Sequence, residues 1–188
     1  GDGNTLAKLV PNYNRVWHDT EWDIQVYSVI DGPKLSPKGN SIFLDTQHVH
    51  MDMSENGERI IIGDEASGDV LAKVYEYDQA SNDWTRIGSD LVVPTMGLHE
   101  GVFTDMDVSM NLDGSVVALS SPTFSTNEGT VQVYNLIDGD WEMVANNLKG
   151  DNQGDKFGSS IALSHDGKII VIGSTGYNKG AGRVSVHM

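Results

Sequence analysis

Apolar and polar residues alternate over short stretches of the chain, and polar turns separate these stretches. The clearest alternating segments are residues 73–77, 130–134 and 183–187. Alternation with a period of two places apolar side chains on one face of a β-strand, and no stretch sustains the longer period of an amphipathic helix. The pattern therefore predicts an all-β chain built from short antiparallel strands.

Turns of one type recur at regular distances along the sequence. Three pairs lie between apolar runs and have the composition of two-residue hairpin turns: Asn56-Gly57, Asp113-Gly114 and Asp166-Gly167. Their glycines are separated by 57 and 53 residues, and Trp84 and Trp141 are also 57 residues apart. A β-sandwich with strands that resemble each other by chance is the alternative, but turn type, strand order and tryptophan position recur together. We therefore predict a β-propeller-like array of four-stranded antiparallel blades with about three recognisable repeats, a partial or degenerate propeller.

The repeats suggest a division of the chain into four parts. These are N-terminal strands in residues 1–35 and repeats in residues 36–93, 94–147 and 148–188, the last repeat being incomplete. Residues 4–10 are a candidate for the missing outer strand. Residues 169–172 are apolar at successive positions, which predicts a central strand buried by blades on both faces. Two organisations stay open: part of a longer propeller, or a small array whose open sides meet a partner.

The last two repeats carry short motifs, of which the two tripeptides lie at matching positions. The motifs are Phe157-Gly158, Gly173-Ser174-Thr175 and Ser120-Ser121-Pro122. In these motifs and their spacing, residues 36–188 resemble the FG-GAP repeats of the integrin α-chain type of β-propeller, in a variety with a short Asp-Gly hairpin. The resemblance implies a seven-bladed protein-binding propeller and favours an extracytoplasmic location, whether secreted, on the cell surface or in an organelle lumen.

Integrin-type blades often bind calcium in a loop between their first two strands, with oxygen ligands at alternate positions before a glycine. Here the corresponding hairpins, residues 54–57, 111–114 and 164–167, are too short and contain too few side-chain oxygens to surround a cation. The calcium sites of the family therefore do not carry over to these residues. We expect no cofactor, although calcium stays an option for other oxygen-rich turns.

Another group of potential metal ligands lies on a predicted strand of the first repeat. His48, His50 and Asp52 alternate, so their side chains share one face and could ligate zinc or iron. The equivalent positions of the third repeat hold Gly158, Ser160 and Ala162, which favours an ordinary packing face between blades. We therefore expect no metal site. Of all residues in the chain, the three named residues of the first repeat come nearest to a set of metal ligands.

The composition narrows the classes of partner. Lys and Arg number 12 against 27 Asp and Glu, which gives a formal net charge of −15 and argues against nucleic acid and anionic lipid as partners. The longest apolar runs hold four residues, far below the roughly 20 that span a bilayer, so direct membrane insertion is not expected. There is no cysteine, which excludes disulfides and thiolate sites.

Motifs for catalysis are scarce: a nucleophile elbow, a phosphate-binding glycine loop and a zinc-protease motif are all absent from the sequence. We therefore predict a non-enzymatic protein-interaction or scaffold module. Its partner-binding loops would carry His99, Glu100, Asp151 and Asp155, which suit a partner with a basic face. The alternatives are a structural accessory subunit of a large assembly, and a carbohydrate-binding propeller that uses Trp84 and Trp141.

Overall fold

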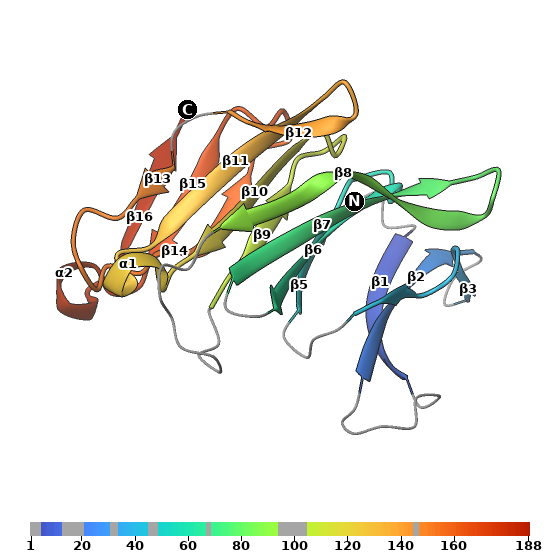
Figure 1. Cartoon of the computed structure of the whole chain (residues 1–188), viewed down its shortest axis with the longest axis horizontal. Helices are drawn as coiled ribbons and strands as arrows, with labels where there is room; N and C mark the ends of the chain where they lie inside the picture. Colours follow the sequence, from blue (N-terminus) through green and yellow to red (C-terminus); the bar gives the residue numbers. More distant parts are fainter. Residues whose placement is uncertain are drawn as a thin grey trace.

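The computed structural model describes residues 5–12, 21–30, 34–44, 49–66, 69–93, 105–144 and 147–188. Four antiparallel sheets follow one another along the chain and stand side by side, from the N-terminal sheet to the C-terminal blade (Figure 1). The all-β, propeller-like architecture predicted from the alternating pattern is therefore confirmed. Over the described ranges no helix has the length and hydropathy to cross a membrane.

The N-terminal sheet contains β1 (Thr5–Asn12), β2 (Glu21–Val29), β3 (Leu35–Pro37) and β4 (Ile42–Phe43). Strands β3 and β4 both pair with β2, so they form the two halves of one outer strand interrupted by a bulge. Residues 35–43 thus belong to this sheet, and the boundary expected after residue 35 is wrong. Because β1 pairs with β2 throughout its length, the N-terminal segment also does not supply an outer strand to the last repeat.

The first blade is the most regular of the sheets. It consists of β5 (Val49–Met53), β6 (Arg59–Ala66), β7 (Asp69–Asp78) and β8 (Asp83–Val93) in that spatial order. Gly57 donates its N–H to the carbonyl oxygen of Ser54 over 2.9 Å, which closes the predicted hairpin turn between β5 and β6. The equivalent bonds close the two later hairpins, from Gly114 to Asn111 and from Gly167 to Ser164.

The second and third blades repeat this plan. The second consists of β9 (Val108–Met110), β10 (Val116–Ser121), β11 (Thr130–Ile137), β12 (Asp140–Met143) and β13 (Leu148–Lys149), and the third of β14 (Phe157–Leu163), β15 (Ile170–Ser174) and β16 (Arg183–His187). Both β12 and β13 pair with β11, so together they make one interrupted outer strand. The expected boundary after residue 147 therefore falls inside the second blade.

Two single-turn helices occupy equivalent loops of the last two blades. They are α1 (Phe124–Asn127), between β10 and β11, and α2 (Tyr177–Gly180), between β15 and β16. Both contain three successive residues with positive φ, residues 125–127 in α1 and 178–180 in α2. The same loop conformation thus recurs from different sequences, as expected for repeats of one structural unit.

The hydrophobic core consists of three layers, one at each boundary between neighbouring sheets. Central-strand residues face alternate sides: Ile60 and Ile62 pack toward the N-terminal sheet, whereas Ile61 packs toward the second blade. The third layer joins the second and third blades and includes Ile170 and Ile172. Burying one such aliphatic side chain stabilises the fold by about 1.5–3 kcal/mol, so the layers hold the array together.

Candidate interaction surfaces

The outer strands of neighbouring sheets are joined by two tryptophans. Trp84 donates its Nε1–H to the carbonyl oxygen of Lys38 over 2.8 Å, and Trp141 donates to that of Ile87 over 3.1 Å. Each side chain is only 8% exposed, because it lies in the layer between two sheets. The recurring tryptophans are thus structural at these boundaries, and neither ring is presented as a platform for a sugar.

The aspartate before each tryptophan completes the same contact. Asp83 accepts hydrogen bonds from the backbone N–H and side-chain amide of Asn40, and Asp140 accepts from the backbone N–H and hydroxyl of Ser89. These bonds favour the charged carboxylates and hold the pKa of each below its ordinary value, with the side-chain bond from Asn40 the largest cause at Asp83 and the backbone bond from Ser89 the largest at Asp140. We call each Asp-Trp pair with its acceptor strand an outer latch.

The inner strands are joined by a second set of bonds. Asp52 accepts the backbone N–H of Met110 over 2.8 Å, and Asp107 accepts that of Ile161 over 2.9 Å. The hydroxyl of Ser109 likewise accepts the N–H of Leu163. These N–H groups lie on the edge of an inner strand, where a polar group without a partner would be costly once removed from water. Side chains of one blade thus satisfy the backbone of the next.

This role accounts for part of the predicted metal group. His48 lies outside the described residues, and Asp52 is bonded to the second blade. The Nδ1 atom of His50 lies 3.9 Å from Oδ1 of Asp107, across the boundary to the second blade. Within the described ranges no three His, Asp or Glu side chains are grouped to hold a metal ion.

Asp107 and Ser109 join two blades, a role that was not predicted from the sequence. Alignment on the hairpin glycines does place Ser109 at the position of Asp52, and Leu163 at that of Met110. The sequence therefore contained one signal for this role: a polar hydrogen-bond acceptor at the same position in the first and second repeats. The signal was incomplete, because the third repeat holds Ala162 at this position.

Side-chain oxygen atoms of the hairpin turns accept hydrogen bonds from backbone N–H groups of the same turns. Asn56 accepts the N–H of Glu58, Asp113 that of Ser115, and Asp166 that of Lys168. Bonds from the adjacent Ser115 and Ser164 hydroxyls are the largest cause of lowered pKa values at Asp113 and Asp166, respectively. The same oxygens that a calcium loop would use therefore stabilise the turns.

The predicted loop that carries Asp151 and Asp155 contacts the loops of α1 and α2 along one rim of the array. Gly150 and Phe157, from the connection between the second and third blades, donate N–H groups to the carbonyl oxygens of Gly129 and Glu128 in the α1 loop. Gly176, beside α2, donates to the carbonyl oxygen of Asp155. The structure therefore brings three loop segments together at this rim, one of which carries the predicted Asp151 and Asp155.

The named residues of this rim differ in their environment. Asp151 is exposed and forms an ion pair with Arg183 at 2.6 Å, and this bond is the largest cause of a raised pKa of Arg183. Asp155 is buried and accepts the N–H of Asn152 over 3.0 Å within its own turn. His99 and Glu100 lie outside the described residues. Partner binding by this rim stays a prediction.

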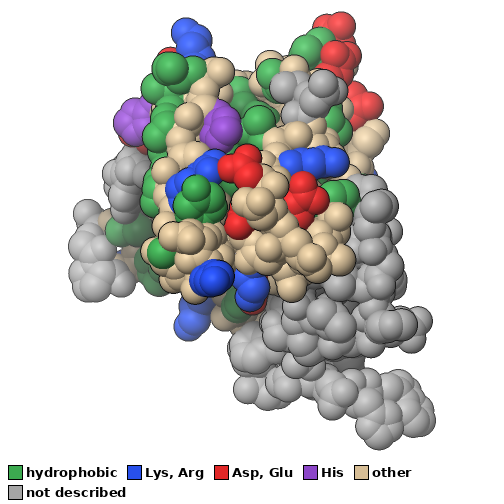
Figure 2. All heavy atoms as spheres, turned by 90° about the vertical axis from the view of Figure 1, so that its left-hand side faces the viewer, with side chains coloured by type: hydrophobic (Ala, Val, Ile, Leu, Met, Phe, Trp, Pro, Cys, Tyr) green, Lys and Arg blue, Asp and Glu red, His purple; other side chains and the backbone are tan. Residues whose placement is uncertain are grey.

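The third blade leaves one apolar face exposed. Val171, Val184 and Val186 are 38%, 70% and 61% exposed, and we call these three residues the open face. Strand pairing places them at the positions of Ala118, Val131 and Val133 in the second blade, the first two of which are fully buried against the third blade. Within the described ranges, a sheet therefore covers residues 169–172 on one side only, and the prediction of burial on both faces is wrong for this part of the chain. The side of the molecule that carries this blade shows hydrophobic side chains interspersed with basic, acidic and histidine side chains (Figure 2).

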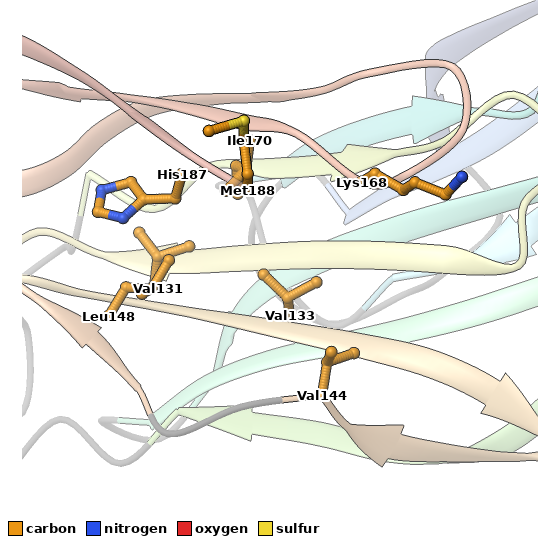
Figure 3. A pocket seen from close by; sticks show the side chains of 8 residues that line it. All are labelled: Val131, Val133, Val144, Leu148, Lys168, Ile170, His187 and Met188. Carbon is orange, nitrogen blue, oxygen red and sulfur yellow. The ribbon is translucent and has the colours of Figure 1, made fainter.

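An apolar pocket lies on the opposite side of the same blade, where it meets the second blade. Its lining residues are Val131, Val133, Val144, Leu148, Lys168, Ile170, His187 and Met188. Side chains of the two blades face each other across a volume of about 150 Å³ (Figure 3). Apolar protein cavities of this size accommodate an aromatic ring.

No family model matches the chain, and no curated protein matches its sequence. TolB from Acinetobacter baumannii gives a TM-score of 0.52 at 14% identity, over 98% of this chain and 38% of its own. A protein from Bacteroides uniformis assigned as a 6-phosphogluconolactonase gives a TM-score of 0.50 at 14% identity, over 88% of this chain and 50% of its own. Both are β-propellers, so this chain has a propeller-type fold and spans half or less of the length of these two similar proteins.

Proposed function

We propose that this chain is a non-enzymatic propeller module that binds another protein, with the open face of its third blade as the docking surface. The supporting observation is the exposure of Val184 and Val186 at positions where the preceding blade packs against its neighbour. Contiguous exposed apolar residues mark interaction sites, because their burial removes unfavourable contact with water. The expected partner is a β-sheet with a complementary apolar face, as at the three boundaries inside the molecule.

This proposal combines two of the roles expected from the sequence, a protein-interaction module and a structural subunit of an assembly. The rim around Asp151 is the competing surface for the same function, with the predicted partner rich in Lys or Arg. The contact of three loop segments supports the rim, but Asp151 and Asp155 are both bonded within the chain. The FG-GAP resemblance also supports protein binding and remains part of the proposal.

The experiment is site-specific photo-crosslinking in the native cells. Benzoylphenylalanine replaces Val184 on the open face, Asp151 on the rim, or Ile137, an exposed apolar residue of the second blade that serves as the control. We expect position 184 to crosslink to one discrete protein. The purified partner should then lose affinity for Val184→Asp by at least about tenfold, while Ile137→Asp binds as the unchanged chain does. Crosslinking from position 151 alone would assign the function to the rim and overturn the proposal.

A further inference from the structure

The first hairpin turn differs from the two later turns in its chemistry. It holds Asn56 before its glycine, where the other two hold Asp113 and Asp166, and no other asparagine of the chain precedes a glycine. An asparagine followed by glycine is the context most prone to deamidation, because glycine has no side chain to hinder attack by its backbone nitrogen on the neighbouring amide carbon. Asn56 is also exposed, so water reaches its side chain.

The closed turn engages the groups that take part in this reaction. The nucleophile is the backbone nitrogen of Gly57, whose N–H donates to the carbonyl oxygen of Ser54 over 2.9 Å. The target is the side-chain amide of Asn56, whose oxygen accepts the Ser54 hydroxyl over 2.8 Å and the N–H of Glu58 over 3.1 Å. Attack moves the amide carbon out of this arrangement, so these bonds oppose the reaction while the hairpin is closed.

The same hairpin lies at a junction of three sheets. The carbonyl oxygen of Gly57 accepts a hydrogen bond from Nζ of Lys38, in the N-terminal sheet, over 2.7 Å. Gly57 also packs so closely against Thr5 of β1 that a Cβ atom would not fit there. On the other side, Glu55 donates its N–H to the carbonyl oxygen of Leu112 in the second blade over 2.9 Å. A change in the backbone of this turn therefore affects contacts with both neighbouring sheets.

We propose that Asn56 is a site of spontaneous covalent modification that the closed hairpin holds in check. When the hairpin opens, the nitrogen of Gly57 loses its proton to the solvent and attacks the side-chain amide carbon of Asn56. The new C–N bond closes a succinimide ring, and the amide nitrogen takes up a proton and leaves as ammonia. Water then opens the ring at either carbonyl carbon, which gives aspartate or isoaspartate. Water is the only co-reactant.

The two products differ in their effect on the fold. Aspartate at this position keeps the acceptor that Asp113 and Asp166 provide in the equivalent turns, where each accepts the N–H of the residue two positions later. Its carboxylate replaces the amide that donates to Oε2 of Glu58 over 3.2 Å. Isoaspartate instead adds one carbon to the backbone, so the turn loses the geometry on which its contacts with the N-terminal sheet depend.

The test compares deamidation of the folded chain with that of the same chain unfolded in guanidinium chloride, at one pH and temperature. Peptide mapping by liquid chromatography and mass spectrometry separates the asparagine, aspartate and isoaspartate forms of each site. We expect Asn56 to react fastest in the unfolded chain and at least about tenfold more slowly in the folded chain, because reaction then requires local opening. Equal rates in the two states, or faster reaction at another asparagine of the unfolded chain, would overturn the proposal.

A matched pair of variants tests the protection by the turn itself. Ser54→Ala removes the hydroxyl that donates to Asn56, and Ser164→Ala removes the equivalent hydroxyl of the third hairpin, which donates to Asp166. In the folded chain, we expect Ser54→Ala to speed deamidation of Asn56 by at least about threefold and Ser164→Ala to change it by less than about twofold. Equal effects of the two variants would show that this turn does not control the reaction.

The consequence for the fold has its own measurement. Chains enriched in isoaspartate by ageing should exchange the amides of β1 faster than Asn56→Asp, which carries the same charge on an unchanged backbone. Equal exchange in the two forms would contradict the effect of isoaspartate on the N-terminal sheet.

Discussion

The outer latch can be tested at Gly88, where the backbone of the first blade approaches Trp141. Gly88 has a φ of +68°, and a Cβ atom there would lie 2.5 Å from Cδ1 and 2.8 Å from Nε1 of Trp141. Gly88→Ala therefore introduces two costs, a left-handed backbone for a residue with a Cβ and the displacement of a buried ring. Gly139→Ala is the matched control, because its φ is +87° and its Cβ would meet no atom within 4 Å.

The magnitudes separate the two variants. The left-handed conformation costs about 1–2 kcal/mol for an alanine, and both variants carry this cost. Only Gly88→Ala also weakens the bond from Trp141 to Ile87, worth about 1 kcal/mol, and strains the packing by about 1–3 kcal/mol. We therefore expect Gly88→Ala to lower the free energy of unfolding by about 2–4 kcal/mol more than Gly139→Ala does.

Urea unfolding followed by circular dichroism measures both changes. A double-mutant cycle then assigns the difference to the ring: in a Trp141→Ala background, Gly88→Ala should cost no more than Gly139→Ala, since no indole remains to be displaced. If the two glycine variants lose stability equally in the unchanged background, to within about 0.5 kcal/mol, the latch does not contribute as argued.

Three further predictions concern the other contacts. Hydrogen bonds lower the pKa of Asp140 in the folded state. The ionised carboxylate therefore stabilises the fold fully above the unfolded-state pKa, and this stabilisation is lost as pH falls through the folded-state pKa. The melting temperatures of the unchanged chain and Asp140→Asn should thus differ above about pH 5 and converge in acid. Asp107→Ala should destabilise the chain by about 1–3 kcal/mol and speed amide exchange at Ile161, whereas protection of that amide at the unchanged level would contradict the inner-strand bond. Chelators and millimolar calcium should leave the melting temperature unchanged at matched ionic strength, and a rise specific to calcium would show an ion site.

The strands and hairpins could be predicted because their signals are local. The Asp-Gly and Asn-Gly turns adopt the bonded geometry that their composition favours, and the spacing between them identifies the blades. Blade boundaries were harder to predict. The outer strand at residues 35–43 is split by a bulge at Gly39 and contains no tryptophan, so it lacks the landmark that defines the outer strands of the repeats.

Burial depends on neighbours that the local pattern does not describe. Ile170 and Val171 are adjacent and similarly apolar, yet one is buried and the other is 38% exposed, because only one side of β15 faces another sheet. The roles of Asp52 and Asp107 in joining blades could also not be predicted from the sequence pattern. A carboxylate that accepts an N–H from the next blade has the same sequence pattern as one that faces solvent.

The two sets of bonds between blades act at opposite edges of the same apolar layer. Outer latches fix one edge through Trp141 and Asp140, and acceptors such as Asp52 fix the other edge. Apolar packing alone is non-directional and would allow neighbouring sheets to slide, whereas hydrogen bonds at both edges define one register.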